Sequence, residues 1–281
     1  MLKPTLKSAA FGGVCAAALG MAVAAFPAAA PAQTAPSHSA AVPDFSGAWQ
    51  RAGPLPSTFL LPEEGLPGPV WDPQDHADGG VLWLGDTSNP ILKVHAAQKV
   101  EARNQYILAG NEDLPAWSLC WPVGVPNVLN MRERVQFLQK PDKITIVYQR
   151  DHNVRRVYLN QAHSENPPLT WYGESVGHYE GDNTLVIDTI ALDPRADIDK
   201  FGTPHSGKLH VIERYTIAPD RSMITADVSV EDPETFNMGW YARATYRSTP
   251  GAVQEVVCAE NNKNASTGQD YPIPKAEKAD Y

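Results

Sequence analysis

The chain has 281 residues, of which 23 are Lys or Arg and 32 are Asp or Glu, so its formal net charge is −9. An acidic surface repels phosphate backbones and anionic lipid heads, which disfavours nucleic acid and membrane surfaces as partners. The length is sufficient to bury a hydrophobic core and suits a single all-β domain.

Residues 1–32 have the pattern of a cleaved secretory signal peptide. Lys3 and Lys7 precede an apolar run over 9–26, and Ala30 and Ala32 place small residues at the cleavage site. The alternative, a membrane anchor, is disfavoured because the run is short and interrupted by Gly and Pro. We therefore expect a periplasmic protein without membrane contact after cleavage. Losing the two lysines of the signal changes the net charge from −9 to −11.

Cys120 and Cys258 are the cysteines that remain after cleavage of the signal. In an oxidising compartment such a pair most simply forms one disulfide. Two alternatives stay open, namely two free buried thiols and a metal site, although the second lacks any C-x-x-C or C-x-x-H spacing.

The part of the chain that follows the signal begins with an arm and a lead-in. Residues 33–43 are mostly small and polar and predict a flexible arm. Residues 44–49 predict a short strand, and its Gly47-Ala48-Trp49 resembles the first-strand motif of lipocalin-like barrels, in which the Trp closes one barrel end. Six prolines over 53–75 predict a long surface excursion. The range 90–110 then has a helical apolar period, with Asn89 expected to cap it.

From Val135 onward the apolar period changes to two, which predicts β-strands separated by turn sequences. A hairpin with its turn at 140–143 comes first, and further strands are expected at 154–159, 174–179, 184–191, 208–217, 223–230, 240–248 and 253–258. We predict a mainly β protein: an antiparallel lipocalin-like barrel of about nine strands with one helix and a long Pro-rich N-terminal excursion. Residues 44–261 would form this single domain, and 262–281 a polar tail.

The sequence lacks the common cofactor and hydrolase motifs. It has no Gly-x-Gly-x-x-Gly, Walker loop, Gly-x-Ser-x-Gly, His-Glu-x-x-His or EF-hand loop. Nucleotide, flavin, α/β-hydrolase and zincin functions therefore lose their usual support, and we expect no cofactor.

Polar residues on apolar strand faces are candidates for chemistry, because burial shifts their pKa values. Asp188 shares a face with Val186 and Ile190, so it is either a structural carboxylate or an orienting acid. Arg156 and Tyr158 share the other candidate face, which is either solvated or able to hold a substrate carboxylate or phenol. Glu213 lies in the more apolar row of its strand.

Histidines and aromatic residues complete the candidate set. His163, His178, His205 and His210 are possible proton carriers near neutral pH, although a loop histidine is often only solvated. A three-histidine metal site is an alternative without diagnostic spacing. Trp171 and Tyr241 either line an aromatic pocket or fill the core.

Several short motifs together resemble a large family of exported, mostly uncharacterised bacterial β-barrel-like proteins. They span residues 44–261 and include Arg155-Arg156-Val157-Tyr158, Pro168-Leu169-Thr170-Trp171-Tyr172-Gly173, Glu180-Gly181-Asp182, Gly202-Thr203-Pro204-His205-Ser206, Glu231-Asp232-Pro233 and Cys258-Ala259-Glu260-Asn261. The pattern is also similar to cofactor-independent decarboxylases of lignin-derived phenylcoumaran dimers. That likeness implies a lyase.

Three functions follow as hypotheses. The first is a periplasmic cofactor-independent decarboxylase, with or without ether-ring opening, acting on a small phenolic acid. Tyr158 and His205 would be its acid/base groups, Asp188 an orienting acid and Arg156 the carboxylate contact, while His163, His178, Trp171, Glu213 and Tyr241 would bind substrate. The second is a non-catalytic lipocalin-like carrier of a hydrophobic ligand, and the third is a metal-dependent hydrolase. The sequence does not indicate an oligomeric state.

Overall fold

The computed structural model describes residues 42–53, 59–60, 66–70, 82–261, 263 and 268–270. The chain divides into two units, Met1–Ser39 and Ala40–Tyr281, and the second contains all of the described residues. The predicted signal peptide and nearly all of the predicted arm and polar tail lie outside them. Within the described residues, no helix has the length and apolar character needed to cross a membrane.

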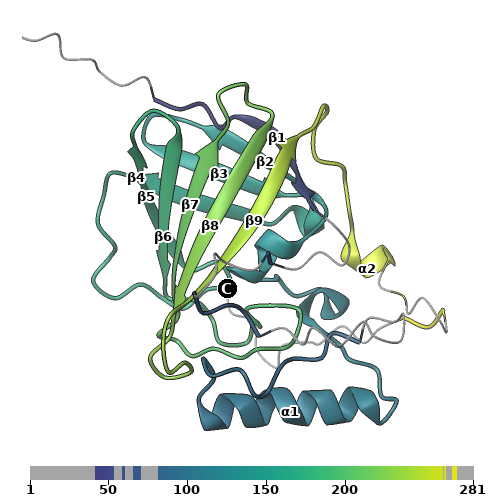
Figure 1. The fold of residues 1–281 in the computed structure, drawn as a ribbon. Coiled ribbons are helices and arrows are strands. Elements are labelled where there is room, and N and C mark those ends of the chain that lie inside the picture. The colour runs from purple at the N-terminus through teal and green to yellow at the C-terminus, as the bar shows by residue number, and fades with distance from the viewer. Residues whose placement is uncertain are drawn as a thin grey trace, which may run out of the picture. The chain divides into compact units, whose positions relative to one another are not determined.

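The described residues form a mainly β protein whose nine strands close into a barrel in sequence order (Figure 1). The last strand pairs with the first, through partners such as Trp49 and Ser248. The strands are β1 (Gly47–Ala52), β2 (Arg134–Gln139), β3 (Lys143–Tyr148), β4 (Val154–Leu159), β5 (Glu174–Glu180), β6 (Thr184–Ile190), β7 (His210–Ile217), β8 (Met223–Glu231) and β9 (Trp240–Ser248). The predicted fold class is therefore confirmed.

One pair of neighbouring strands departs from the predicted antiparallel pattern. Strands β4 and β5 run parallel and share the register Val157–Ser175, Tyr158–Val176 and Leu159–Gly177. A parallel pair needs a crossover connection of roughly a dozen residues or more, which residues 160–173 supply. The prediction of a strictly antiparallel barrel was wrong here, because strand periodicity carries no information about strand direction.

Two predicted segments differ from the structure, the first in its bounds and cap and the second in its type of element. The helix predicted for 90–110 is present as the shorter α1 (Val94–Leu108). The prediction that Asn89 caps it is wrong, because the helix begins after Lys93; Asn89 lies in the preceding turn, where its Oδ1 accepts a hydrogen bond from the Ile91 N–H at 3.1 Å. The strand predicted for 253–258 is wrong. Residues 252–257 have no regular structure, and α2 (Cys258–Asn261) follows them.

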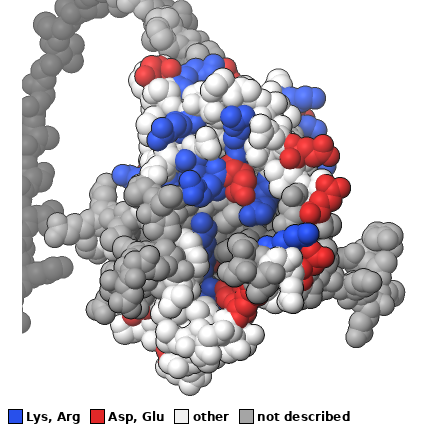
Figure 2. All heavy atoms as spheres, turned by 90° about the vertical axis from the view of Figure 1, so that its right-hand side faces the viewer, with Lys and Arg blue, Asp and Glu red and all other residues white. Residues whose placement is uncertain are grey.

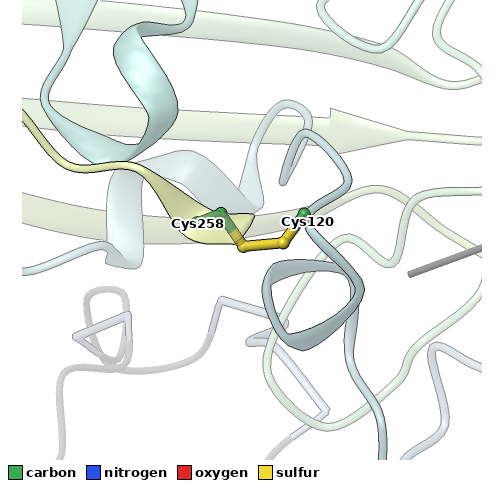
Figure 3. The surroundings of a disulfide bond; sticks show 2 residues. All are labelled: Cys120 and Cys258. Atoms are coloured by element: carbon green, nitrogen blue, oxygen red, sulfur yellow. A yellow bond between two sulfur atoms is a disulfide. The ribbon is translucent and has the colours of Figure 1, made fainter. Parts of the chain in front are cut away.

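The disulfide predicted between Cys120 and Cys258 is present, with 5.6 Å between the two Cα atoms (Figure 3). It joins α2 to the segment that follows the short 3-10 helix Ala116–Leu119. The C-terminal segment is thus fixed by a covalent bond rather than by strand pairing. The nine strands already close on themselves through the β1–β9 pair, so they leave no sheet edge for the β-branched Val256-Val257 to extend.

Part of the predicted Pro-rich excursion continues the barrel wall beyond β1. The Leu60 N–H donates to the Arg243 carbonyl of β9 at 2.8 Å, and the Tyr241 N–H donates to the Pro67 carbonyl at 2.9 Å. The excursion therefore supplies backbone partners for β9 where β1 no longer does.

Alternating side chains fill the barrel interior. Trp49, Ile146, Ile187 and Tyr215 are all at most 2% exposed, as is Trp240 at the start of β9. The Trp49 indole donates a hydrogen bond to the Phe45 carbonyl at 3.0 Å, which satisfies its polar atom within the core. Burial of this first-strand tryptophan agrees with the prediction from Gly47-Ala48-Trp49.

An ion pair lies inside the barrel, where Arg155 of β4 meets Glu213 of β7, and both side chains are at most 1% exposed. Ser175 and Thr189 accept further hydrogen bonds from the Arg155 guanidinium at 2.9 and 2.6 Å, and the Tyr215 hydroxyl donates to Glu213 at 2.8 Å. Burial alone would lower the pKa of Arg155, but the charge of Glu213 raises it. The pair is therefore charged, hydrogen-bonded and enclosed.

Replacing Glu213 with Gln should destabilise the fold by about 3–5 kcal/mol, because the charge of Arg155 would remain buried without its counterion. Urea denaturation measures the effect. Asp227→Asn is the matched control, since it breaks the half-exposed Asp227–Arg243 pair and should cost at most about 1 kcal/mol. Equal small losses in both variants would contradict this account of the buried pair.

A second buried acidic group lies in the connection between β6 and β7. Asp199 is 2% exposed, and its Oδ1 accepts hydrogen bonds from the N–H groups of Phe201 and Thr203 at 2.8 and 3.1 Å. Burial, followed by the charge of Asp199, raises the pKa of the nearby Asp197 to about 7. Asp197 therefore ionises within the physiological pH range.

Because the folded state binds this proton more tightly than the unfolded chain, stability should fall as pH rises from about 4 to about 7. Asp197→Asn removes the titrating group and should stabilise the protein at pH 8 by on the order of 2 kcal/mol, since solvent screens part of the ~1.4 kcal/mol per pKa unit. Thermal melts of both proteins from pH 4 to pH 8 test this. A wild-type advantage at pH 8 would disprove it.

Candidate functional site

A pocket of about 470 Å³ opens on the outer wall of the barrel beside the parallel β4–β5 pair. The crossover between these strands forms one of its walls through Pro167, Pro168 and Thr170. The crossover also contributes Trp171, Tyr172 and Gly173, and the remaining lining comes from both strands and from neighbouring loops: Pro122, Asn153, Val154, Arg155, Arg156, Tyr158, Glu174 and Ser175.

Strand alternation aims the polar side chains of β4 at this pocket. Arg155, Val157 and Leu159 are buried in the barrel, so the residues between them point outward. Tyr158 is 41% exposed, and Arg156 is also exposed. The parallel register sets Tyr158 opposite Val176, which makes Arg156 level with Glu174 on the same outer face. A cation, a phenol and a carboxylate therefore share one pocket.

Aromatic rings form another part of the pocket lining. Trp171 lies 5.5 Å from Trp121 between ring centroids, and the Arg195 guanidinium sits 4.6 Å from the Trp171 ring centre. Tyr172 stacks on Tyr148 at 5.6 Å with an interplanar angle of 11°. These contacts fix flat apolar surfaces that suit a ring-containing ligand.

Glu174 connects the pocket to a cluster of histidines and acids. Its Oε1 lies 3.0 Å from His163 Nδ1, and the opposite ring nitrogen, His163 Nε2, lies 3.1 Å from Asp188 Oδ1. His210 Nε2 lies 2.8 Å from the same Asp188 oxygen. The His163 side chain is 20% exposed and that of Asp188 is 37% exposed. We call Glu174, His163, Asp188 and His210 the histidine–acid chain.

The pKa shifts within the chain follow from these contacts. Hydrogen bonds from Ser164 are the main cause that lowers the pKa of Glu174. Burial would raise the pKa of Asp188, but hydrogen bonds with His210 and His163 lower it. The hydrogen bond to Asp188 raises the pKa of His210. Both carboxylates are thus ionised at neutral pH, and His210 holds its proton more tightly than a free histidine.

The structure brings together five of the residues predicted for a site. Arg156, Tyr158 and Trp171 line the pocket, while His163 and Asp188 are connected to it through Glu174. Asp188 is held by two histidines rather than by backbone amides or an arginine.

The other four residues predicted for a site lie outside the pocket and its histidine–acid chain. His205 is 6% exposed, its Nδ1 lies 2.7 Å from the Ser206 carbonyl, and burial lowers its pKa. His178 is exposed and contacts Glu180 at 3.1 Å. Glu213 is inside the barrel. Tyr241 lines a separate outer pocket of about 280 Å³ together with residues such as Leu66 and Ile212. His205 does not line the outer-wall pocket; it interacts with Asp193, which pairs with Arg195 above the Trp171 ring.

Glu174 was not a candidate from the sequence, and His210 was considered only as one of four histidines and was given no role in the site. Glu174 begins β5, and His210 begins β7, where it alternates with Ile212 and Arg214 on the outer face. The alternation around His210 was visible in the sequence. Its partner was not, because the pairing register of β6 with β7 decides which side chains meet.

Among the described residues, no group of three or more His, Cys, Asp or Glu side chains could hold a metal ion. His163 and His210 both point their Nε2 atoms at a single oxygen of Asp188. The hypothesis of a metal-dependent hydrolase therefore gains no support from this part of the chain.

The charge distribution is less uniform than the net charge suggests. Lys and Arg side chains gather near the centre of one face, with Asp and Glu beside them (Figure 2). Burial first, and then the charges of Arg132, Arg51 and Arg150, lower the pKa of Lys200 to about 8, against the opposing charge of Glu133. The net charge disfavours nucleic acid and anionic membranes as partners, and this conclusion stays a prediction.

No protein-family model matches the chain, and no curated protein shows significant similarity to it. The family resemblance of its motifs stays a prediction. Function therefore has to be argued from the geometry of the site.

Asp188→Asn should lower the pKa of His210 toward the ordinary value of 6.5, because the neutral amide no longer favours the imidazolium. A raised pKa in the folded state stabilises the protein below about pH 6.5, and this contribution disappears as pH rises through the folded-state pKa. NMR titration of the imidazole signals measures the shift. His178 should be unaffected, and an unmoved His210 would refute the role of Asp188.

Proposed function

We propose that the protein is a cofactor-independent carbon–carbon lyase that decarboxylates a small phenolic acid in the outer-wall pocket. The observation that carries this proposal is the presence of Arg156, Tyr158 and Glu174 in one aromatic-walled pocket. Its volume of about 470 Å³ lies within the usual range for small-molecule sites.

Arg156 would bind the substrate carboxylate. It makes no ion pair with any residue that the structure describes, so its guanidinium is available to a ligand. Its exposure keeps that contact solvated and moderate in strength. Moderate binding suits decarboxylation, since a strong clamp on the carboxylate would stabilise the ground state more than the transition state.

The reaction needs no oxidant and no metal. The bond between the carboxylate carbon and the substrate carbon breaks, carbon dioxide leaves, and the electron pair stays on the substrate carbon, which then takes a proton from an acid. Tyr158 would donate a hydrogen bond to the phenolic oxygen and hold the ring in the orientation that proton transfer to the substrate carbon needs. The walls around Trp171 and Tyr172 would hold the ring and exclude water from one side.

The alternative of a lipocalin-like carrier is less well supported. Such a carrier holds its ligand within the barrel, whereas here Arg155, Tyr215 and Trp240 are among the side chains that fill the interior. A carrier function would have to use the same outer-wall pocket. Binding without turnover would then distinguish the two.

The proposed location is the periplasm. The disulfide between Cys120 and Cys258 is compatible with an oxidising compartment. The signal peptide on which the prediction also depends lies outside the described residues.

The proposal predicts that the purified mature protein releases carbon dioxide from at least one member of a phenolic-acid library. Arg156→Ala should lower kcat/KM about 10²-fold, mainly by raising KM, because it removes a charged hydrogen bond to the carboxylate. Tyr158→Phe should instead lower kcat, also by about 10²-fold.

Arg221→Ala is the matched control, since Arg221 is exposed and pairs with Asp44 away from the pocket. It should leave both constants unchanged. Acids that quench tryptophan fluorescence but are never turned over would overturn the lyase and favour the carrier. Turnover that Arg156→Ala leaves intact would place the reaction elsewhere.

A further inference from the structure

The histidine–acid chain runs from the pocket to solvent without a gap. Glu174 lines the pocket, His163 and Asp188 follow at 3.0 and 3.1 Å, and His210 completes the chain at 2.8 Å with 35% of its side chain exposed. Its members come from β5, the β4–β5 crossover, β6 and β7. Each link is a hydrogen bond between titratable groups, which is the arrangement that proton transfer requires.

The hydrogen-bond donors of the two histidines determine where protons lie in the histidine–acid chain. Ionised Asp188 only accepts, so the Nε2 atoms of both His163 and His210 donate to it. A neutral His163 would then direct the lone pair of Nδ1 at Glu174 Oε1. That contact is favourable only when His163 is an imidazolium or when Glu174 is protonated. Because Glu174 is ionised, this hydrogen bond needs a proton on His163 Nδ1, and that proton can pass to Glu174 when the substrate takes one.

The carboxylates around His163 and His210 favour the protonated form of both histidines. His163 faces Glu174 and Asp188, and His210 faces Asp188 from β6 and Glu231 from β8. Two carboxylates surround each histidine, and the described contacts of the two rings include no Lys or Arg. Protons taken from solvent at His210 are thus held by negative charge along the chain.

Decarboxylation consumes one proton in each turnover, because the substrate carbon that loses carbon dioxide must gain hydrogen. We propose that the histidine–acid chain supplies this proton, with Glu174 as the acid facing the substrate and His210 as the end that is recharged from water. This inference rests on the proposed function and adds the direction of proton flow to it. His163 and Asp188 are positioning residues that act through Glu174.

A purely structural role would use the same contacts. Ser164 donates to Glu174 from its backbone N–H at 2.7 Å and from its hydroxyl at 2.6 Å, so this corner also anchors the crossover that forms the pocket wall. Removing His163 would disturb both roles. The two differ at His210, which does not contact the crossover and can lose its titration while keeping a hydrogen-bond donor.

His210→Gln is therefore the decisive variant, because the amide can still donate to Asp188 but cannot carry a proton. We expect kcat to fall about tenfold or more above pH 7 with KM unchanged, and the alkaline limb of the pH–rate profile to move to lower pH. His178→Gln is the matched control. His178 is an outward histidine on β5 that contacts Glu180 and lies outside the chain. A pH profile of His210→Gln that matches wild type would overturn the proposal.

A second measurement does not depend on turnover. In His163→Gln, Asp188 loses the competing imidazole, so NMR titration should show a higher pKa for His210, whereas His178→Gln should leave it unchanged. If no phenolic acid is turned over, the proposed function fails, and the inference fails with it. If turnover occurs but either the pH profile of His210→Gln or the titration of His210 in His163→Gln matches wild type, only the inference fails.

Discussion

The buried ion pair between Arg155 and Glu213 is the constraint on which the barrel and its pocket depend. It joins β4 to β7 through the interior, and Ser175 and Thr189 complete the hydrogen bonds of the guanidinium. Adjacent strand residues point to opposite faces, so an inward Arg155 forces Arg156 outward. A shift of β4 by one residue would leave Glu213 buried without its partner, which is costly enough to fix the register.

The parallel pairing of β4 and β5 determines where the pocket forms. An antiparallel hairpin would have joined these strands by a short turn, whereas the parallel arrangement sends residues 160–173 back across the outer wall. Because of this path, His163 contacts Glu174 of β5, and Trp171 and Tyr172 line the pocket beside β4 and β5. The same crossover thus supplies the aromatic lining and the central histidine of the chain.

Strand periodicity predicted most of the fold, because alternating side chains leave a clear pattern in the sequence. It placed Arg155 and Arg156 on opposite faces and Glu213 in an apolar row, which the structure puts inside. It could not say that Asp188 points outward, because Val186 and Leu185 are both buried and each face of β6 is apolar. It also could not predict that Glu174 meets His163 or that His210 meets Asp188, since these contacts depend on strand direction and register.

The two polar systems of the barrel differ in whether their protons can move near neutral pH. Inside, burial raises the pKa of Tyr148 to about 12 and also raises the pKa values of Tyr215 and Tyr246, and Glu213 raises that of Arg155. These groups keep their protons and serve the fold. Outside, His163 and His210 touch ionised carboxylates while retaining contact with water. The solvent-accessible histidine–carboxylate contacts therefore lie on the outer wall, where the pocket opens, and the interior holds the strands that position them.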